Sequence, residues 1–340
     1  MTIQTAKFLA AYSINALLPF IANTAESAPQ AMRPAVSEAA CPLVVIEAPT
    51  RDNHKATAVI RTPPGNDRRP AIIFLHGGLG TLKLDVLKKD VLSQPNQCRF
   101  LAAGYITVAA TFRPRSEDPQ TRDALIDCLA VIDYVKKLPR VDPKSVVIFG
   151  GSGGGSLALE LAGETELCAV AGGEPANVLF TGMMNKQHRD PNELMEEPKK
   201  HYTPELQKFT EAKISKINCP VLIVHSNLHP INKVNNDIVI PAMRAASKYY
   251  EIVFFPEQQH GFYNGYGQAV GMKVYDTLAS FYLRHVATKP KPIDSSLIEL
   301  EPVVHPGPRV ERDPSAKAKR AAIYEKAKQG GKAVSPVPEN

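Results

Sequence analysis

The chain has 340 residues, of which 44% are hydrophobic, and a chain of this size can bury one large core or two smaller ones. Its formal net charge at pH 7 is +6, and the basic residues form no stripe interleaved with aromatic residues, so the composition argues against nucleic-acid binding. The five cysteines lack the spacing of metal ligands, so no metal site is expected.

The N-terminal residues have the pattern of an export signal. Lys7 is the only charged residue before Glu26, an apolar run covers residues 8–22, and small residues offer cleavage points at Ala22, Ala25 and Ala28. The run is short and interrupted by polar residues, so it does not predict a membrane span, and a buried N-terminal helix is the alternative. We expect a signal peptide over residues 1–25, a periplasmic or secreted protein, and no stable membrane span after cleavage.

Export would place the cysteines in an oxidising compartment. At most two disulfides could form from the five cysteines, with one thiol remaining. Cys128 lies in a helical pattern and Cys168 in a strand pattern, where cysteine usually acts as a small buried hydrophobe. If a bridge forms, Cys41 and Cys98 are the expected pair.

From residue 43 onward, strand and helix patterns alternate along the chain. Strands are expected over residues 43–46, 56–60, 71–75, 105–112, 146–149 and 168–171. Helices are expected over residues 81–103, with a kink at Pro95, and over 122–137. This alternation predicts an α/β protein with right-handed crossovers and a mostly parallel sheet flanked by helices.

The alternation breaks after Glu174. Residues 177–217 are rich in charge, methionine and proline, and we expect them to form a helical insertion. Strands then resume over 221–225 and 251–255, with helices over 239–249 and 272–286. Residues 288–340 carry many prolines and charges with almost no apolar periodicity, which is typical of a disordered tail.

Ser152 lies in the most informative motif of the chain. Glycines flank it on both sides, and the motif joins the expected strand 146–149 to a helical stretch at 157–162. A serine between glycines at a sharp strand-to-helix turn has the pattern of a nucleophile elbow, because larger side chains would collide there. A flexible loop or a phosphate-binding loop is the alternative.

Two histidine motifs also follow expected strands. His76, Gly77 and Gly78 come directly after the strand 71–75, and the backbone N–H groups of Gly77 or Gly78, with that of Gly153, could bind an oxyanion. His260, followed by a glycine and a phenylalanine, comes shortly after the strand 251–255. The carboxyl ends of parallel strands share one sheet edge, so His260 is placed to activate Ser152.

Four segments carry a resemblance to a known family. They are FLHGG at Phe74–Gly78, LAAGYITVAATFRPR at Leu101–Arg115, AVIDYVKKLPRVDPKSVVIFGGSGGG at Ala130–Gly155 and FFPEQQHGF at Phe254–Phe262. The chain resembles the α/β-hydrolases, within them the branch of dienelactone hydrolase and prolyl oligopeptidase. The resemblance implies a hydrolase domain over residues 40–287 with Ser152 as nucleophile and His260 as general base. It also implies that the insertion 177–217 is a small cap over the site.

One position departs from the family pattern. The family's acid usually follows the strand corresponding to 221–225, in a segment resembling His-Gly-x-x-Asp-Pro. This chain has His229 where the aspartate is expected. A neutral His229 could accept a hydrogen bond from His260, and Glu174 and Asp237 are the alternative acids.

A different class of protein fits part of the same motif. Gly153, Gly155 and Ala158 match a dinucleotide-binding fingerprint, and Glu174 follows about twenty residues on. A nicotinamide-dependent oxidoreductase would explain these residues, but it would not explain the motifs at His76 and His260.

We therefore expect an exported serine hydrolase that needs no cofactor. A carboxylesterase acting on small or medium acyl esters is favoured, and a serine peptidase acting on short peptides is the nearest alternative. A binding protein that keeps the hydrolase fold without its chemistry is a further alternative. Phe262, Tyr263 and Tyr266 are expected near the mouth of the site, with core packing an equal expectation for Phe262.

Overall fold

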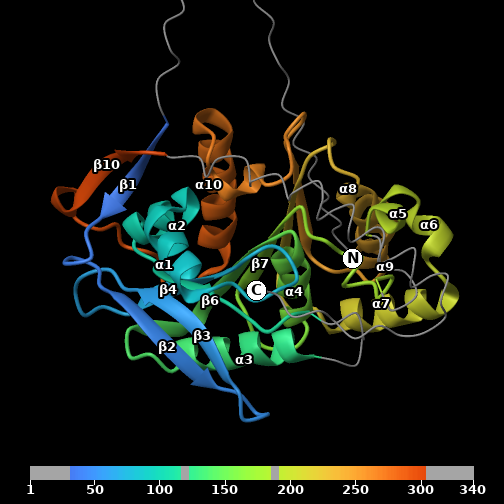
Figure 1. Ribbon diagram of the computed structural model, residues 1–340, viewed down its shortest axis with the longest axis horizontal. Coiled ribbons are helices and arrows are strands. Elements are labelled where there is room, and N and C mark those ends of the chain that lie inside the picture. The colour runs from blue at the N-terminus through green and yellow to red at the C-terminus, as the bar shows by residue number, and fades with distance from the viewer. Residues whose placement is uncertain (1–30, 116–121, 185–190, 304–340) are drawn as a thin grey trace, which may run out of the picture. The chain divides into compact units, whose positions relative to one another are not determined.

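The computed structural model describes residues 31–115, 122–184 and 191–303. Eight strands form one sheet (Figure 1), in the order β2 (Leu43–Pro49), β3 (Lys55–Arg61), β5 (Ile106–Ala110), β4 (Arg69–Leu75), β6 (Val141–Gly151), β7 (Ala169–Gly173), β8 (Val221–His225) and β9 (Tyr250–Phe254). The pairs β2–β3 and β3–β5 are antiparallel, and every pair from β5 to β9 is parallel. The expectation of a mostly parallel sheet is confirmed.

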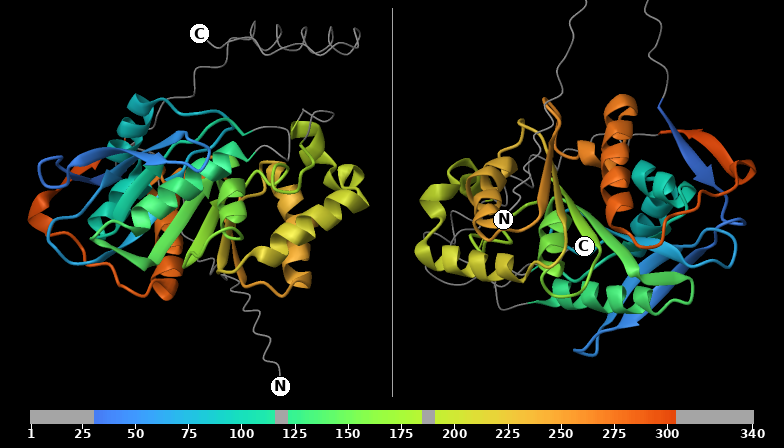
Figure 2. Two further views of the ribbon diagram at one scale, coloured as in Figure 1. Left: turned by 90° about the horizontal axis from the view of Figure 1, so that it is seen from below. Right: turned by 180° about the vertical axis from the view of Figure 1, so that it is seen from behind.

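Helices cover both faces of this sheet (Figure 2). The helices in the described residues are α1 (Leu84–Ser93), α2 (Pro95–Ala102), α3 (Asp123–Lys136), α4 (Gly153–Leu161), α5 (Pro191–Glu196), α6 (Pro198–His201), α7 (Pro204–Lys216), α8 (Ile231–Val234), α9 (Ile240–Ala245) and α10 (Gln268–His285). A π-helical turn at Asn235–Val239 joins α8 to α9, and 3₁₀ turns lie at Phe262–Asn264 and Ser295–Leu297. Among the described residues, no helix combines the length and hydrophobicity needed to cross a bilayer.

The strand β4 shows why the sheet is buried on both sides. Its seven residues are all buried, as expected for a central parallel strand. Ile73 and Leu75 pack into the core under α3, α4, α7 and α9, whereas Ile72 and Phe74 pack into the core under α2 and α10. Neighbouring side chains of a strand point to opposite faces, so this unbroken apolar run supplies two cores.

The helix expected over 81–103 is two helices. Gln94 separates them, and its side chain accepts a hydrogen bond from the backbone N–H of Gln97 at 2.7 Å. Pro95 occupies the first turn of α2, where its missing N–H costs nothing. The expected kink at Pro95 is therefore a helix end followed by a new, capped start.

Residues 177–217 contain the helices α5, α6 and α7, as expected of a helical insertion. Thr203 caps α7, since its hydroxyl accepts from the N–H of Leu206 at 3.4 Å. Near its C-terminal end α7 belongs to the main core, because Ile214 is fully buried there. The insertion is thus anchored to the sheet at this end.

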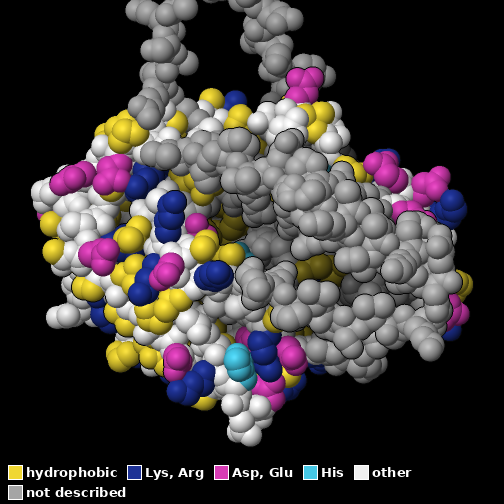
Figure 3. All heavy atoms as spheres, viewed as in Figure 1, with side chains coloured by type: hydrophobic (Ala, Val, Ile, Leu, Met, Phe, Trp, Pro, Cys, Tyr) yellow, Lys and Arg dark blue, Asp and Glu magenta, His cyan; other side chains and the backbone are white. Residues whose placement is uncertain are grey.

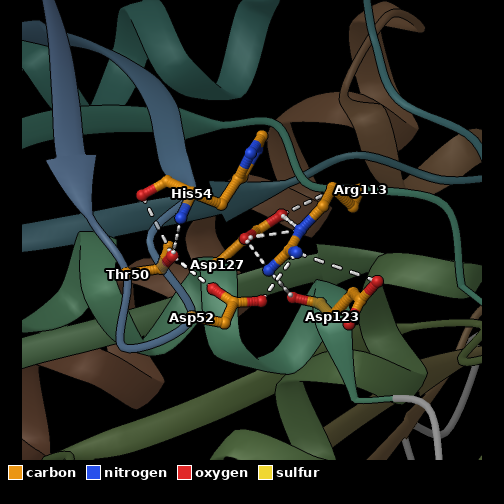
Figure 4. Close-up of polar contacts among 6 residues, drawn as sticks. All are labelled: Thr50, Asp52, His54, Arg113, Asp123 and Asp127. Carbon is orange, nitrogen blue, oxygen red and sulfur yellow. Dashed lines mark hydrogen bonds and ion pairs between the residues drawn. The ribbon is translucent and has the colours of Figure 1, made fainter.

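Arg113, in the loop after β5, joins three parts of the fold (Figure 4). Its guanidinium binds Asp127 of α3 at 2.8 Å and Asp52 of the β2–β3 turn at 2.7 Å, and Asp123 lies at 3.8 Å. The Asp127 side chain is only 1% exposed, so this pair needs the several hydrogen bonds it makes to offset desolvation. Among the coloured residues of the face shown in Figure 3, basic and acidic side chains are interspersed.

The two ends of the described chain pair with each other. β1 (Met32–Val36) and β10 (Ile298–Pro302) form a separate antiparallel sheet, visible beside α2 in Figure 1. Residues 288–303 were expected to belong to a disordered tail, and for these residues that expectation is wrong. A short, mostly exposed strand gives little signal in the sequence. β10 forms because its backbone pairs with β1, which is distant in the sequence. The expected signal peptide and the remainder of the tail lie outside the described residues.

No disulfide joins Cys41 to Cys98, the pair expected if a bridge formed. All five cysteines lie in described segments and are free thiols. The Sγ of Cys98 lies 3.4 Å from Arg33 Nη1 and 3.4 Å from the carbonyl oxygen of Leu92. The Cys98 thiol is therefore buried and contacts two polar groups. Burial raises the pKa of this thiol.

Ending the chain after Lys289 is expected to destabilise the fold. The cut removes β10, the buried Ile293, and the carbonyl oxygen of Lys291 that accepts from Arg69 Nη1 at 2.6 Å. We expect the melting temperature to fall by roughly 5 °C or more, from the loss of a few kcal/mol of contacts. A chain ending after Val303, which keeps β10, is the matched control, and equal melting curves for the two truncations would contradict the prediction.

Candidate functional site

Ser152 occupies a sharp turn between β6 and α4. Its φ and ψ are 52° and −116°, a conformation that non-glycine residues seldom adopt and that functional sites often hold under strain. The surrounding glycines are sterically required. A Cβ on Gly150 would lie 2.1 Å from the carbonyl oxygen of Gly154, and a Cβ on Gly154 would lie 2.4 Å from that of Leu75. The turn geometry expected from the sequence is therefore present.

The segment after β7 brackets this serine on both sides. The Ser152 N–H donates to the carbonyl oxygen of Gly173 at 2.8 Å, and the Ala176 N–H donates to the carbonyl oxygen of Ser152 at 2.9 Å. Glu174 lies between these two contacts with a φ of 42°, and its side chain is fully buried. The backbone bonds thus place a buried carboxylate beside the serine turn.

Glu174 is joined to His260. The Nδ1–H of His260 donates to Oε2 of Glu174 at 2.7 Å, and the side-chain amide of Asn232 donates to Oε1 at 3.0 Å. Burial by itself would raise the pKa of Glu174, but the hydrogen bonds from His260 and Asn232 outweigh it and hold the pKa below its usual value. The carboxylate therefore stays ionised through the neutral pH range and orients the imidazole.

His229 does not take the acid's place. Its ring lies against that of His260, with centroids 4.4 Å apart and planes tilted by 32°. Its Nδ1 accepts from the backbone N–H of Ile231 at 3.1 Å, while the Nδ1 of His260 is already bonded to Glu174. Burial, followed by the proximity of His260, lowers the pKa of His229, so this ring is neutral at pH 7. The expectation that His229 accepts from His260 is wrong.

Asp237, the other alternative acid, lies elsewhere. It is an exposed residue of the π-helical turn, and its carboxylate lies 3.9 Å from Lys199 Nζ. Among the residues proposed from the sequence as the acid, only Glu174 forms a hydrogen bond with His260 in the described structure.

Tyr263 contacts both the serine turn and His260, which the sequence pattern did not predict. Its ring fills a slot over Gly151 and Gly173, where a Cβ would lie 2.3 Å and 2.4 Å from ring atoms. These glycines are register partners at the ends of β6 and β7, so two missing side chains create one space. The Tyr263 hydroxyl lies 3.4 Å from Nε2 of His260. Tyr263 is buried beside His260, and the partly buried Phe262 packs against Phe255.

The three glycines expected to bind an oxyanion lie together. A Cβ on Gly77 would lie 3.5 Å from Cβ of Ser152, and a Cβ on Gly153 would lie 2.2 Å from the carbonyl oxygen of Gly78. Gly78 has a φ of 84°, which favours glycine. The ring of His76 stacks on that of Phe112, with centroids 4.1 Å apart. The segment with Gly77 and Gly78 therefore lies beside Ser152 and the start of α4.

Comparisons with known proteins identify the family of this chain. The sequence profile described as "Prolyl oligopeptidase family" matches residues 110–289, which is more than half of the chain. The chain belongs to the prolyl oligopeptidase family. An Escherichia coli relative, described as "Uncharacterized 31.7 kDa protein in traX-finO intergenic region", is 28% identical over 139 residues. That match covers 38% of this chain and 46% of the relative, so it spans about half the relative's length.

Solved structures with the same fold include esterases and peptidases. The carboxylesterase EstE1, cloned from a metagenomic library, superposes with a TM-score of 0.55 at 19% identity, covering 75% of this chain and 92% of its own. The acylaminoacyl peptidase of Pyrococcus horikoshii superposes with a TM-score of 0.56 at 15% identity, covering 76% of this chain and 44% of its own. These similarities confirm the expected α/β-hydrolase fold.

Packing around the serine turn accounts for the glycine pattern that resembles a dinucleotide fingerprint. A Cβ on Gly155 would lie 2.9 Å from the carbonyl oxygen of Gly150 and 3.0 Å from Pro175, so this glycine allows α4 to pack on the turn. Glu174 is buried and bonded to His260 and Asn232, and cannot also bind a ribose. Within residues 31–115, 122–184 and 191–303, no cluster of three His, Cys, Asp or Glu residues could hold a metal ion.

Proposed function

We propose that this protein is a serine hydrolase that cleaves esters of small or medium acyl groups through an acyl-enzyme on Ser152. The observation that carries the proposal is the buried Glu174 carboxylate, bonded to His260 at 2.7 Å, beside a strained serine turn. A serine hydroxyl needs a base to accept its proton, and the base needs a partner that fixes its orientation. Both are supplied here by residues that lie far apart in the sequence.

The proposed chemistry gives each group one role. Nε2 of His260 takes the proton of Ser152 as Oγ bonds to the substrate's carbonyl carbon, and Glu174 stabilises the resulting imidazolium. The carbonyl oxygen becomes an oxyanion, held by the N–H of Gly153 and that of Gly77 or Gly78. His260 then returns the proton to the leaving alcohol, and water hydrolyses the acyl-enzyme by the same steps. These steps use only groups of the protein, the substrate and water.

Turnover on different substrates distinguishes an esterase from a peptidase. The family name and the acylaminoacyl peptidase of the same fold favour short peptides as a second candidate substrate. We expect faster turnover on p-nitrophenyl acetate or butyrate than on aminoacyl p-nitroanilides. A fluorophosphonate probe, which phosphonylates an activated serine, separates either enzyme from a binding protein, because the latter would not react. Binding of NADH without phosphonylation would instead favour the oxidoreductase.

We also propose that the enzyme is exported and acts in the periplasm or outside the cell, on the basis of the apolar run at residues 8–22. After expression of the full chain in a bacterial host, the mature N-terminus is expected near residue 26. N-terminal sequencing of the periplasmic fraction measures this. A mature chain that still begins at Met1 would contradict export by this route.

A further inference from the structure

Arg115 makes three polar contacts from the loop after β5. Its backbone N–H donates to the carbonyl oxygen of Leu79 at 2.7 Å. Its guanidinium donates through Nη1 to the carbonyl oxygen of Gly153 at 3.2 Å and through Nη2 to Oε1 of Glu160 at 2.8 Å. The side chain is only 8% exposed, so these bonds form largely away from water.

The two backbone partners of Arg115 belong to the two segments that would hold the oxyanion. Leu79 directly follows Gly78, and Gly153 begins α4 directly after Ser152. The segments touch, because a Cβ on Gly153 would lie 2.2 Å from the carbonyl oxygen of Gly78. One residue therefore bonds to both segments close to their point of contact.

We propose that Arg115 is a positioning residue for the oxyanion hole, holding the Gly77–Gly78 segment and the start of α4 at the spacing that lets their N–H groups converge. The inference rests on the proposed hydrolase function. An oxyanion hole works through donors fixed before the reaction, and a displacement of about 1 Å can cost roughly a hundredfold in rate. Arg115 touches neither substrate nor the reacting atoms, so its effect is indirect.

The charge of Arg115 is balanced within a small network. Glu160 of α4 accepts from Arg115 and also from Lys213 Nζ at 2.9 Å, and Lys213 further donates to the carbonyl oxygen of Phe180 at 3.1 Å. Lys213 thus belongs to the same ion cluster but binds neither Leu79 nor Gly153 in the described structure. This makes Lys213 a control for loss of a partly buried cation from the same cluster.

Arg113, in the same loop, contacts different parts of the fold from those that Arg115 contacts. Arg113 lies two residues earlier, and its ion pairs are with Asp52, Asp123 and Asp127, on the β2–β3 turn and α3 (Figure 4). The two arginines therefore serve different parts of the fold. A planar guanidinium also reaches Gly153 and Glu160 together, which the single ammonium of a lysine does less well.

The test compares Arg115→Met, Arg115→Lys and Lys213→Met on p-nitrophenyl butyrate. We expect Arg115→Met to lower kcat by about tenfold to a hundredfold with KM within about twofold, because the donors act mainly in the transition state. Inhibition by a trifluoromethyl ketone, whose adduct with Ser152 carries an oxyanion, should weaken by a similar factor. Arg115→Lys should recover part of the loss, and Lys213→Met should lower the melting temperature while leaving kcat near wild type.

Several results would overturn the inference. One is a wild-type kcat and ketone affinity in Arg115→Met, and another is an equal loss of kcat in Lys213→Met, which would assign the effect to general stability. If Arg115→Met does not fold, Arg115→Lys decides, since a wild-type kcat in that folded variant would exclude the positioning role. A wild-type enzyme that neither hydrolyses the ester nor reacts with fluorophosphonate would instead overturn the proposed function itself.

Discussion

Replacing Ser152 with alanine is expected to lower turnover of a p-nitrophenyl ester by at least about a thousandfold, leaving only the contributions of binding and the oxyanion hole. The variant lacks the oxygen that forms the acyl-enzyme, while alanine keeps the Cβ that the strained turn already accommodates. Steady-state hydrolysis and fluorophosphonate labelling measure the two consequences, and both should be lost together.

Ser156 offers a matched control for the Ser152 variant. It lies one turn further along α4 and its side chain is fully buried. Ser156→Ala should keep both labelling and turnover, and melting curves should show that each variant is folded. A correctly folded Ser152→Ala variant with unchanged turnover would exclude the proposed mechanism.

Replacing Glu174 with glutamine is expected to lower kcat by roughly a thousandfold to ten-thousandfold, as loss of the carboxylate does in serine proteases. The glutamine amide removes the negative charge that would stabilise the His260 imidazolium, and its NH₂ group can favour the wrong tautomer of the ring. Because the pKa of Glu174 is held below its usual value, the wild-type carboxylate is charged throughout the neutral range and the loss should be similar across it.

His229→Ala is the informative companion to Glu174→Gln. His229 stacks on His260 but accepts no hydrogen bond from it, so we expect only a mild decrease in kcat, within about tenfold of wild type. The sequence pattern taken alone suggests that His229→Asp should raise turnover by restoring an acid. In the structure the Nδ1 of His260 is already bonded to Glu174, and that gain is no longer expected. A severe loss in His229→Ala with a mild loss in Glu174→Gln would reverse the assignment.

The strands that form the centre of the sheet could be predicted from the sequence. The apolar runs that became β4, β6 and β8 are short and bounded by turn residues, which is typical of parallel strands buried on both faces. The pairing of β1 with β10 could not be predicted, because both strands are short, partly exposed and far apart in the sequence. The free thiols of Cys41 and Cys98 likewise depend on packing, since spacing along the chain says nothing of distance in space.

The sequence by itself determined the serine turn and the glycine segments, because a sharp turn and close backbone approaches demand glycine at particular positions. Gly150 and Gly154 are examples, since any side chain there would overlap backbone atoms. Only the tertiary structure decided which residue forms the hydrogen bond with Nδ1 of His260. Glu174 and His229 both follow parallel strands at the same edge of the sheet, so their order in the chain does not distinguish them. The choice depends on the direction of each loop, which hydrogen bonds between distant residues set: Gly173 with Ser152, and Asn232 with Glu174.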